Sequence, residues 1–396
     1  MQDVSPNSLS HVARGREIGG FVIIGCGRPW CGDGQATPTR GRPVRRKIIR
    51  SASRPPGRLA LRVAGAFAIL AIVTPVAGVA ALRLQYAGTP PSDAVTRGRD
   101  ALWLGHSWVD GRKTPADAAR LAATLRDTGV HDLYVHVGPL EEDGRLDPTV
   151  RPRSAPLVRA LHRALPSARV LAWVGGVVGR QGLDLDRPET RDRIWAAAEG
   201  VLADGFDGVH YDLEPVASGD DSLLALLQAT RTAMARHGAV LSVAAPKLEP
   251  LPGMAEAATI GGGRGTQWTP RFLGEVAHDV DQVVLMAYDT GLPLESLYGG
   301  YVARLTHLAL GAVPASTDLL IGVPAFHDEN TGHHASAETV RAALRGVRLG
   351  LSDDLARKRF GVALYVDFAA TDADWQAYRD AWGIRASAAR HRPAPG

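Results

Sequence analysis

Cysteine is nearly absent from this chain of 396 residues, and its two copies, Cys26 and Cys31, both lie near the N-terminus. The rest of the chain therefore has no thiol with which to build a disulfide framework or a cysteine metal site. The two cysteines stand in a polar, glycine-rich stretch that is not typical of a folded segment, so we interpret them as incidental. We predict no metal site and no cofactor.

Acidic residues are scarce up to Arg62, where twelve Lys/Arg face three Asp/Glu, and the rest of the chain then carries a net charge of −5 within the total of +4. Charge of either sign is missing from residues 63–82, a run long enough at about 1.5 Å per residue to span about 30 Å of hydrocarbon. The basic flank precedes this run, so the positive-inside rule places the N-terminus in the cytoplasm. A signal peptide is the alternative, but the long upstream arm disfavours it. The topology accounts for the basic charge, and we predict no nucleic-acid partner.

These patterns divide the chain into five segments. We predict a disordered basic cytoplasmic arm (1–58), a transmembrane anchor (59–84), a Pro/Gly/Ser linker (85–97), a folded domain (98–385) and a disordered tail (386–396). The protein is then expected in the cell membrane as a single-pass protein, with its folded domain outside the cytoplasm.

Short apolar runs alternate with helical stretches through the folded domain. Eight runs of about eight residues, each closed by Gly, Pro or polar residues, begin at Ala101, Asp132, Arg169, Gly208, Ala239, Gln282, Leu319 and Gly361. The spacers carry helix signals, such as the capping box of Thr114 and Asp117 and the terminal Gly238. Eight such units predict a (β/α)8 barrel with its active site at the carboxyl ends of the strands. A doubly wound sheet is the alternative, but no glycine-rich nucleotide fingerprint follows the first run.

The fourth run, GFDGVHYDLEPV, places ionisable residues on alternate positions. Strand side chains alternate between faces, so Tyr211 and Leu213 should point towards the helices, while His210, Asp212 and Glu214 point into the barrel. Buried carboxylates that lie close together repel, which raises at least one pKa. Glu214 is therefore the candidate proton donor and Asp212 its partner. A charge network that only fixes strand register is the alternative; three ligands stacked along one strand converge poorly on a metal.

The segment DGVHYDLE resembles the D-G-x-D-x-D-x-E signature of glycoside hydrolase family 18, the chitinase-like barrels. VLAWVGG is similar to the family's third-strand S-x-G-G segment, VVLMAYD to its sixth-strand M-x-Y-D motif, and LLIGVPAF to its seventh strand. The fourth- and sixth-strand motifs are the specific ones. The four matches occur in order and on the predicted strands.

The resemblance implies roles for matching residues. Glu214 corresponds to the general acid/base, and Asp212 to the carboxylate that orients the N-acetyl group of the substrate. The acetamido oxygen of the substrate would then attack the anomeric carbon, giving retention through an oxazolinium ion. Tyr288 corresponds to the tyrosine that binds the acetamido group, and Met286 and Asp289 to residues that line the same subsite.

Other positions match less closely. Asp207 corresponds to the first aspartate of the signature, which mainly supports the strand. His210 replaces the second aspartate, which shares a proton with the position of Asp212; a histidine is expected to hold Asp212 by a hydrogen bond. Tyr365 takes the place of a tryptophan that floors the sugar subsite in the family.

Several further residues are candidates without a motif. Trp108 is expected to face the substrate, and Lys247 to bind it or pair with an acid. Trp268 is expected to stack on a sugar or to pack on a helix. The histidine-rich stretch 327–334 is interpreted as a solvated loop rather than a metal site. The remaining tryptophans of the domain's first half are assigned to the core: Trp103, Trp173 and Trp195.

We therefore predict a membrane-anchored, monomeric glycoside hydrolase that cleaves a β-linked glycan containing N-acetylated amino sugars by substrate-assisted retaining hydrolysis. The membrane anchor points to a glycan of the cell envelope. One alternative is a glycan-binding barrel with weak or no catalysis. The other is a glycosidase with two enzyme carboxylates, for which Asp289 and Asp367 would be the second acid.

Overall fold

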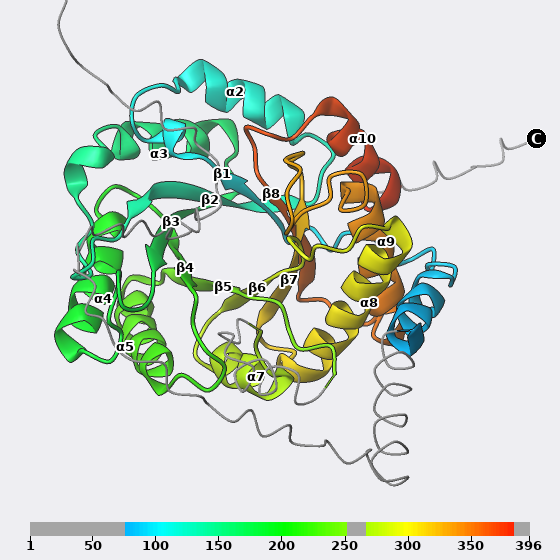
Figure 1. Ribbon diagram of the computed structural model, residues 1–396. Coiled ribbons are helices and arrows are strands. Elements are labelled where there is room, and N and C mark those ends of the chain that lie inside the picture. The colour runs from blue at the N-terminus through cyan, green and yellow to red at the C-terminus, as the bar shows by residue number, and fades with distance from the viewer. Residues whose placement is uncertain (1–75, 252–266, 384–396) are drawn as a thin grey trace, which may run out of the picture. The chain divides into compact units, whose positions relative to one another are not determined.

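The computed structural model describes residues 76–251 and 267–383, within which eight parallel strands close into a barrel (Figure 1). The order around the barrel follows the chain, and the last strand pairs with the first. The strands are β1 (Asp100–Leu104), β2 (Val130–Pro139), β3 (Arg169–Val177), β4 (Gly208–Glu214), β5 (Val240–Ala245), β6 (Gln282–Met286), β7 (Asp318–Pro324) and β8 (Phe360–Tyr365). The predicted (β/α)8 barrel is confirmed, and closure excludes the doubly wound sheet.

Helices cover the outside of the barrel (Figure 1). They are α2 (Pro115–Thr124), α3 (Ser154–Ala164), α4 (Pro188–Leu202), α5 (Asp221–His237), α7 (Pro270–His278), α8 (Glu295–Ala312), α9 (Val340–Gly350) and α10 (Asp372–Ala381). Three short 3-10 turns interrupt the loops: η1 (His106–Trp108), η2 (Pro148–Val150) and η3 (Leu351–Asp353).

Local signals account for the helix boundaries. Asp117 closes a capping box on Thr114 at the start of α2, and Asp374 does the same on Thr371 at the start of α10. Helix α5 ends at Gly238, whose φ of 64° is the left-handed conformation that glycine adopts without a steric penalty. These caps were predictable because each needs only residues close together in the sequence.

The barrel wall separates two apolar clusters. Outward-facing strand residues such as Leu102 and Val135 join the large cluster beneath the helices. Inward-facing residues such as Trp103, Tyr134 and Leu171 form a second cluster inside the barrel. Burying one such side chain fully contributes about 1.5–3 kcal/mol, so the alternation fixes which face of each strand points inward.

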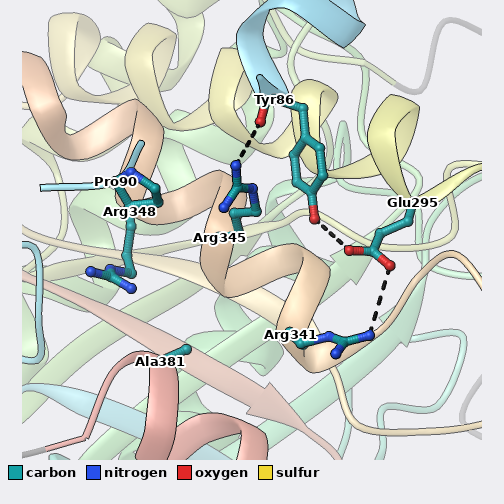
Figure 2. A pocket seen from close by; sticks show the side chains of 7 residues that line it. All are labelled: Tyr86, Pro90, Glu295, Arg341, Arg345, Arg348 and Ala381. Atoms are coloured by element: carbon teal, nitrogen blue, oxygen red, sulfur yellow. Dashed lines mark hydrogen bonds and ion pairs between the residues drawn. The ribbon is translucent and has the colours of Figure 1, made fainter. Parts of the chain in front are cut away.

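The segment before β1 is attached to the barrel. Residues 76–86 are helical, and the Tyr86 hydroxyl donates to Glu295 Oε1 at 2.6 Å. Figure 2 shows the guanidinium of Arg345 donating to the Tyr86 carbonyl at 3.2 Å, and it also reaches Gly88 O at 2.8 Å. Arg348 donates to the carbonyls of Pro91 and Ala94, both at 2.9 Å. The stretch predicted as a linker is thus held on α8 and α9 rather than left unattached.

The predicted membrane anchor is largely beyond the described residues. Within 76–251 and 267–383, no helix combines the length and apolar character needed to cross a membrane. Residues 59–75 of the predicted anchor, the basic arm with both cysteines, and the C-terminal tail all lie outside those ranges.

Candidate active site

The lower end of β4 is fixed by two neighbouring residues. A Cβ on Gly208 would lie 2.1 Å from the carbonyl oxygen of Val240, so only glycine allows β4 and β5 to approach this closely. The carboxylate of Asp207 accepts hydrogen bonds from Val170 N at 2.7 Å and His162 Nε2 at 2.8 Å. Asp207 therefore supports the strand at its amino end. This is the role that the resemblance implies, and seven residues at about 3.3 Å each separate Asp207 from the carboxyl end of the strand, where a substrate would bind.

The inward row of β4 is arranged as the alternation predicts. Tyr211 is fully buried and Leu213 is 5% exposed, and both belong to the cluster beneath the helices. His210, Asp212 and Glu214 therefore take the opposite face, with Glu214 at the carboxyl end of the strand. The barrel mouth thus receives two carboxyl groups from a single strand.

One of the two carboxylate oxygens of Asp212 has a hydrogen-bond partner among the described residues. Its Oδ2 accepts a hydrogen bond from Trp173 Nε1 at 2.9 Å, while its buried Oδ1 has no partner among the described residues. Burial raises the pKa of Asp212, and the Trp173 hydrogen bond acts in the opposite direction. An orphaned buried carboxylate oxygen is costly, so this atom is ready to accept a proton or a donor from a ligand.

Glu214 holds its proton unusually tightly. Burial, and then the negative charge of Asp212, raise the pKa of Glu214 to about 7; nearby Lys247 lowers it and Asp289 raises it. The ammonium of Lys247 is fixed by a 3.1 Å hydrogen bond to the carbonyl oxygen of Tyr288. Glu214 is therefore a carboxyl group that can both give and take a proton near neutral pH.

Aromatic side chains line the neighbouring part of the mouth. Tyr288 and Tyr365 stack with their ring centroids 5.3 Å apart and an interplanar angle of 23°, and Phe326 meets both edge-on at 5.9 and 5.7 Å. Met286 packs in the same small cluster. Burial raises the pKa of Tyr288 well above its ordinary value, and nearby Tyr365 and the acids raise it further. The Tyr288 hydroxyl therefore keeps its proton and can donate a hydrogen bond.

Three carboxylates lie close enough to Tyr288 and Tyr365 to affect the pKa of both hydroxyls. The carboxylates of Asp212, Asp289 and Glu214 all contribute to raising the pKa of Tyr288 and of Tyr365. The six predicted residues that come together at the mouth, besides Glu214 itself, are Asp212, Lys247, Met286, Tyr288, Asp289 and Tyr365.

His210 lies below this layer. It is fully buried, its Nε2 accepts from Trp103 Nε1 at 3.2 Å, and its Nδ1 lies 2.8 Å from Ser242 Oγ. Burial lowers the pKa of His210 to about 3, so the ring is neutral with its proton on Nδ1. The expected hydrogen bond to Asp212 is wrong, because both ring nitrogens are engaged elsewhere, and the fully buried ring is not placed to contact a substrate.

A polar chain continues downward from His210. Ser242 Oγ donates to Gln282 Oε1 at 2.8 Å, and Gln282 Nε2 donates to Asp132 Oδ2 at 2.7 Å. Asp132 in turn accepts two hydrogen bonds of 2.7 Å from Arg169. The buried histidine is thus part of a satisfied hydrogen-bond network that ends at the ion pair of Asp132 and Arg169.

Trp108 does not offer an open face for a sugar. It is 3% exposed, and its Nε1 donates to Asp367 Oδ2 at 2.7 Å. Asp367 Oδ1 accepts from Gly105 N at 2.9 Å, and burial raises the pKa of Asp367. The prediction for Trp108 is therefore wrong, and both oxygens of Asp367 serve to fix the loop after β1.

The histidine-rich stretch is solvated over residues 327–331, as interpreted, but His333 is fully buried. His327 Nε2 lies 2.9 Å from Asp374 Oδ2, and His334 Nδ1 lies 2.7 Å from Glu329 Oε1. The described part of the chain contains no group of three or more His, Cys, Asp or Glu side chains that could hold a metal ion.

Tryptophan assignments met different outcomes. Trp268 is 1% exposed, donates to Val216 O at 3.0 Å and packs on Phe272, so it takes the helix-packing alternative. Trp173 belongs to the core, as predicted, and it is also the hydrogen-bond donor of Asp212. The alternation of side chains along β3 shows that Trp173 points into the barrel. Its position opposite His210, and so its contact with Asp212, could be predicted only from the register between β3 and β4.

Sequence comparison with protein-family models and with curated proteins finds no match. Solved structures do match. The barrel is similar to a chitinase from Chromobacterium violaceum, with 16% identity, a TM-score of 0.50, and coverage of 72% of this chain and 98% of that one. It is also similar to the spore cortex-lytic enzyme SleL of Bacillus megaterium, with 14% identity, a TM-score of 0.52, and coverage of 75% and 76%. SleL of Bacillus cereus is comparable, at 13% identity and a TM-score of 0.51 over 75% and 76%. The predicted chitinase-like barrel fold is confirmed by these similarities.

Proposed function

We propose that this chain is a glycoside hydrolase that cleaves a β-linked glycan containing N-acetylated amino sugars, with Glu214 as the general acid/base. The observation that carries the proposal is the inward row of β4, which places Glu214 at the carboxyl end of the strand, two residues beyond Asp212, in a chitinase-like barrel. Burial and the charge of Asp212 raise the pKa of Glu214 to about 7. A carboxyl group with such a pKa can protonate a leaving glycosidic oxygen near neutral pH.

The neighbouring groups suit a substrate-assisted reaction. The unpartnered Oδ1 of Asp212 accepts the N–H of the acetamido group and orients its oxygen towards the anomeric carbon. The Tyr288 hydroxyl donates to that acetamido group. Glu214 gives its proton to the leaving oxygen as the C–O bond breaks and the oxazolinium ring forms. Glu214 then takes a proton from water, which attacks the same carbon and opens the ring, so that configuration is retained.

The structural neighbours support this substrate class. One is a chitinase and two are spore cortex-lytic enzymes, so barrels of this shape act on chitin and on spore cortex. Between a chitin-like and a cell-envelope glycan we propose the cell-envelope glycan, because the proposed membrane anchor would hold the barrel beside the envelope.

Two-carboxylate hydrolysis is less well supported. Asp367 already accepts two hydrogen bonds from the loop after β1, and Asp289 lies 3.2 Å from His333, so neither is a free nucleophile. A glycan-binding protein without catalysis does not need a carboxyl group with a pKa near neutrality, whereas a general acid does.

A panel of glycans tests the proposal with wild type, Glu214→Gln and Asp212→Asn. Chitin oligosaccharides, peptidoglycan and an acetamido-free β-glucan serve as substrates. We expect wild type to cleave only glycans that contain an acetamido group, and we expect Glu214→Gln to lose a factor of at least about 10² in kcat. A thiazoline mimic of the oxazolinium ion should inhibit the wild-type enzyme.

Equal turnover by Glu214→Gln and wild type refutes the assignment of Glu214 as the general acid/base. Cleavage of the acetamido-free glycan, or its trapping by a 2-fluoro sugar, favours the two-carboxylate alternative; glycan binding without turnover by wild type favours the binding protein.

We further propose that residues 59–84 anchor the chain in the cell membrane, with the N-terminus cytoplasmic and the barrel on the other side, as a monomer. The uncharged run of residues 63–82 and the basic flank before it support this. Protease protection of the barrel in inverted and right-side-out vesicles tests the topology. Release of the intact chain by carbonate or high salt would contradict an anchor.

A further inference from the structure

His333 occupies an unusual environment for a residue in a polar loop. Its side chain is fully buried, its Nδ1 lies 3.2 Å from Asp289 Oδ1 and 3.5 Å from Glu338 Oε2, and its ring stacks on Phe326 at 4.2 Å. Neither ring nitrogen makes an aligned hydrogen bond to a described residue. The contact with the two carboxylates is therefore between charges rather than between a directed donor and acceptor.

The second carboxylate fixes the turn that follows β6. Glu338, 1% exposed, accepts hydrogen bonds from Thr290 N and Thr290 Oγ1, both at 3.0 Å, and from Gly291 N at 3.1 Å. Asp289, which starts this turn, has a φ of 55°, a conformation that residues with a Cβ adopt rarely. The turn after β6 is thus held by Glu338, four residues beyond the histidine-rich stretch 327–334.

The charges around His333 indicate the protonation state of its ring. The titratable groups that act on it are Asp289 from the end of β6 and Glu338, and Glu329 lies near it. Tyr298 from α8 lies near the same two carboxylates, Asp289 and Glu338. Two carboxylates so close to a buried ring need a positive charge between them. Burial alone would lower the pKa of His333, but Asp289 and Glu338 raise it to about 9.

We propose that His333 is a positioning residue: as an imidazolium between Asp289 and Glu338, it holds the turn after β6 and partly neutralises Asp289 beside Glu214. This inference rests on the proposed function, in which Asp289 is one of the charges that tune the proton donor. Because the folded pKa lies above the ordinary value of about 6.5, the imidazolium is complete below pH 6.5 and is lost as the pH rises through about 9. The contact of His333 with Asp289 and Glu338 should therefore weaken in alkaline solution.

The first test reads the charge directly and needs no activity. The full chain, labelled with ¹⁵N-histidine, is titrated from pH 5 to pH 10 by NMR, and the His333 signal is identified by its loss in His333→Gln. We expect a charged ring at pH 7.5 and a lower pKa in Glu338→Gln, which removes one carboxylate but keeps its shape. A neutral ring at pH 7.5 overturns the proposal, whether or not the enzyme is active.

The second test reads the positioning role. In His333→Gln the Asp289 charge is no longer balanced, so the basic limb of the kcat–pH profile should move to higher pH and KM should rise. His334→Gln, which changes the exposed neighbouring histidine, is the matched control and should behave as wild type. A charged His333 with unchanged profile and KM in His333→Gln refutes the positioning role.

The two tests separate this proposal from the proposed function. Where no glycan is cleaved, the ¹³Cδ titration of Glu214 replaces the kinetic profile. The pKa of Glu214 should be higher in His333→Gln than in wild type, because the negative charge of Asp289 raises this pKa and is no longer balanced by an imidazolium. An unchanged Glu214 titration overturns the positioning role even in an inactive protein.

Discussion

Replacing Trp173 by phenylalanine removes the single hydrogen bond that the described residues give to Asp212. The ring is retained, while the indole N–H that points at Oδ2 from 2.9 Å is lost. Asp212 is buried and its other oxygen already lacks a partner, so its ionised form would be left without a donor. The change therefore acts on the charge of the carboxylate more than on packing.

The magnitude follows from the strength of such a contact. A hydrogen bond to a charged group is worth about 1.5–3 kcal/mol, and one pKa unit corresponds to about 1.4 kcal/mol. We expect the pKa of Asp212, already raised by burial, to rise by a further one to two units. On the proposed mechanism the ionised form accepts the acetamido N–H, so the acid limb of kcat/KM should move up by the same amount. On that limb, activity at a fixed pH falls about tenfold per unit.

The assay is a pH profile of kcat/KM with a fluorogenic N-acetylglucosamine oligosaccharide, together with the ¹³Cγ titration of Asp212. Trp195→Phe is the matched control, because Trp195 Nε1 donates to the surface carboxylate of Asp192 at 3.3 Å. It should leave both measurements unchanged. An acid limb and an Asp212 titration that stay within a few tenths of a unit of wild type in Trp173→Phe would refute the role given to this hydrogen bond.

Two further changes separate strand support from site chemistry. Asp207→Asn weakens the acceptor of Val170 N and His162, so urea unfolding should show a loss of about 1 kcal/mol with kcat/KM unchanged; a large fall in kcat/KM at full stability would restore a substrate role. Lys247→Met removes the charge that lowers the pKa of Glu214, so the basic limb of the kcat profile should move to higher pH. A downward shift would contradict the placement of Lys247.

The barrel could be predicted because its signals are local. Each strand is a short apolar run closed by Gly, Pro or polar residues, and each cap lies within a few residues of its helix. The inward row of β4 follows from the period of two alone, since Tyr211 and Leu213 had to join the outer core. These inferences need no knowledge of which strands pair.

The partners of the site residues could not be predicted because they depend on register. Trp173 on β3 reaches Asp212 on the neighbouring strand β4, and Trp103 reaches His210 across the barrel interior. The sequence shows three polar residues in one row but not which donor each meets. The burial of His333 was missed for a related reason: it depends on contacts with Asp289, from the end of β6, and with Phe326 and Glu338.

The neutral state of His210 also constrains how the proposed site can store a proton. Its Nε2 lone pair is used by Trp103 and its Nδ1 proton by Ser242, so it can neither take a proton from Asp212 nor give one. Trp173, the hydrogen-bond donor to Asp212, does not exchange protons in the working pH range. A proton on Asp212 can then be passed only to Glu214, to water or to the substrate. The two carboxyl groups should therefore titrate as a pair that shares one proton, with the single-proton form active.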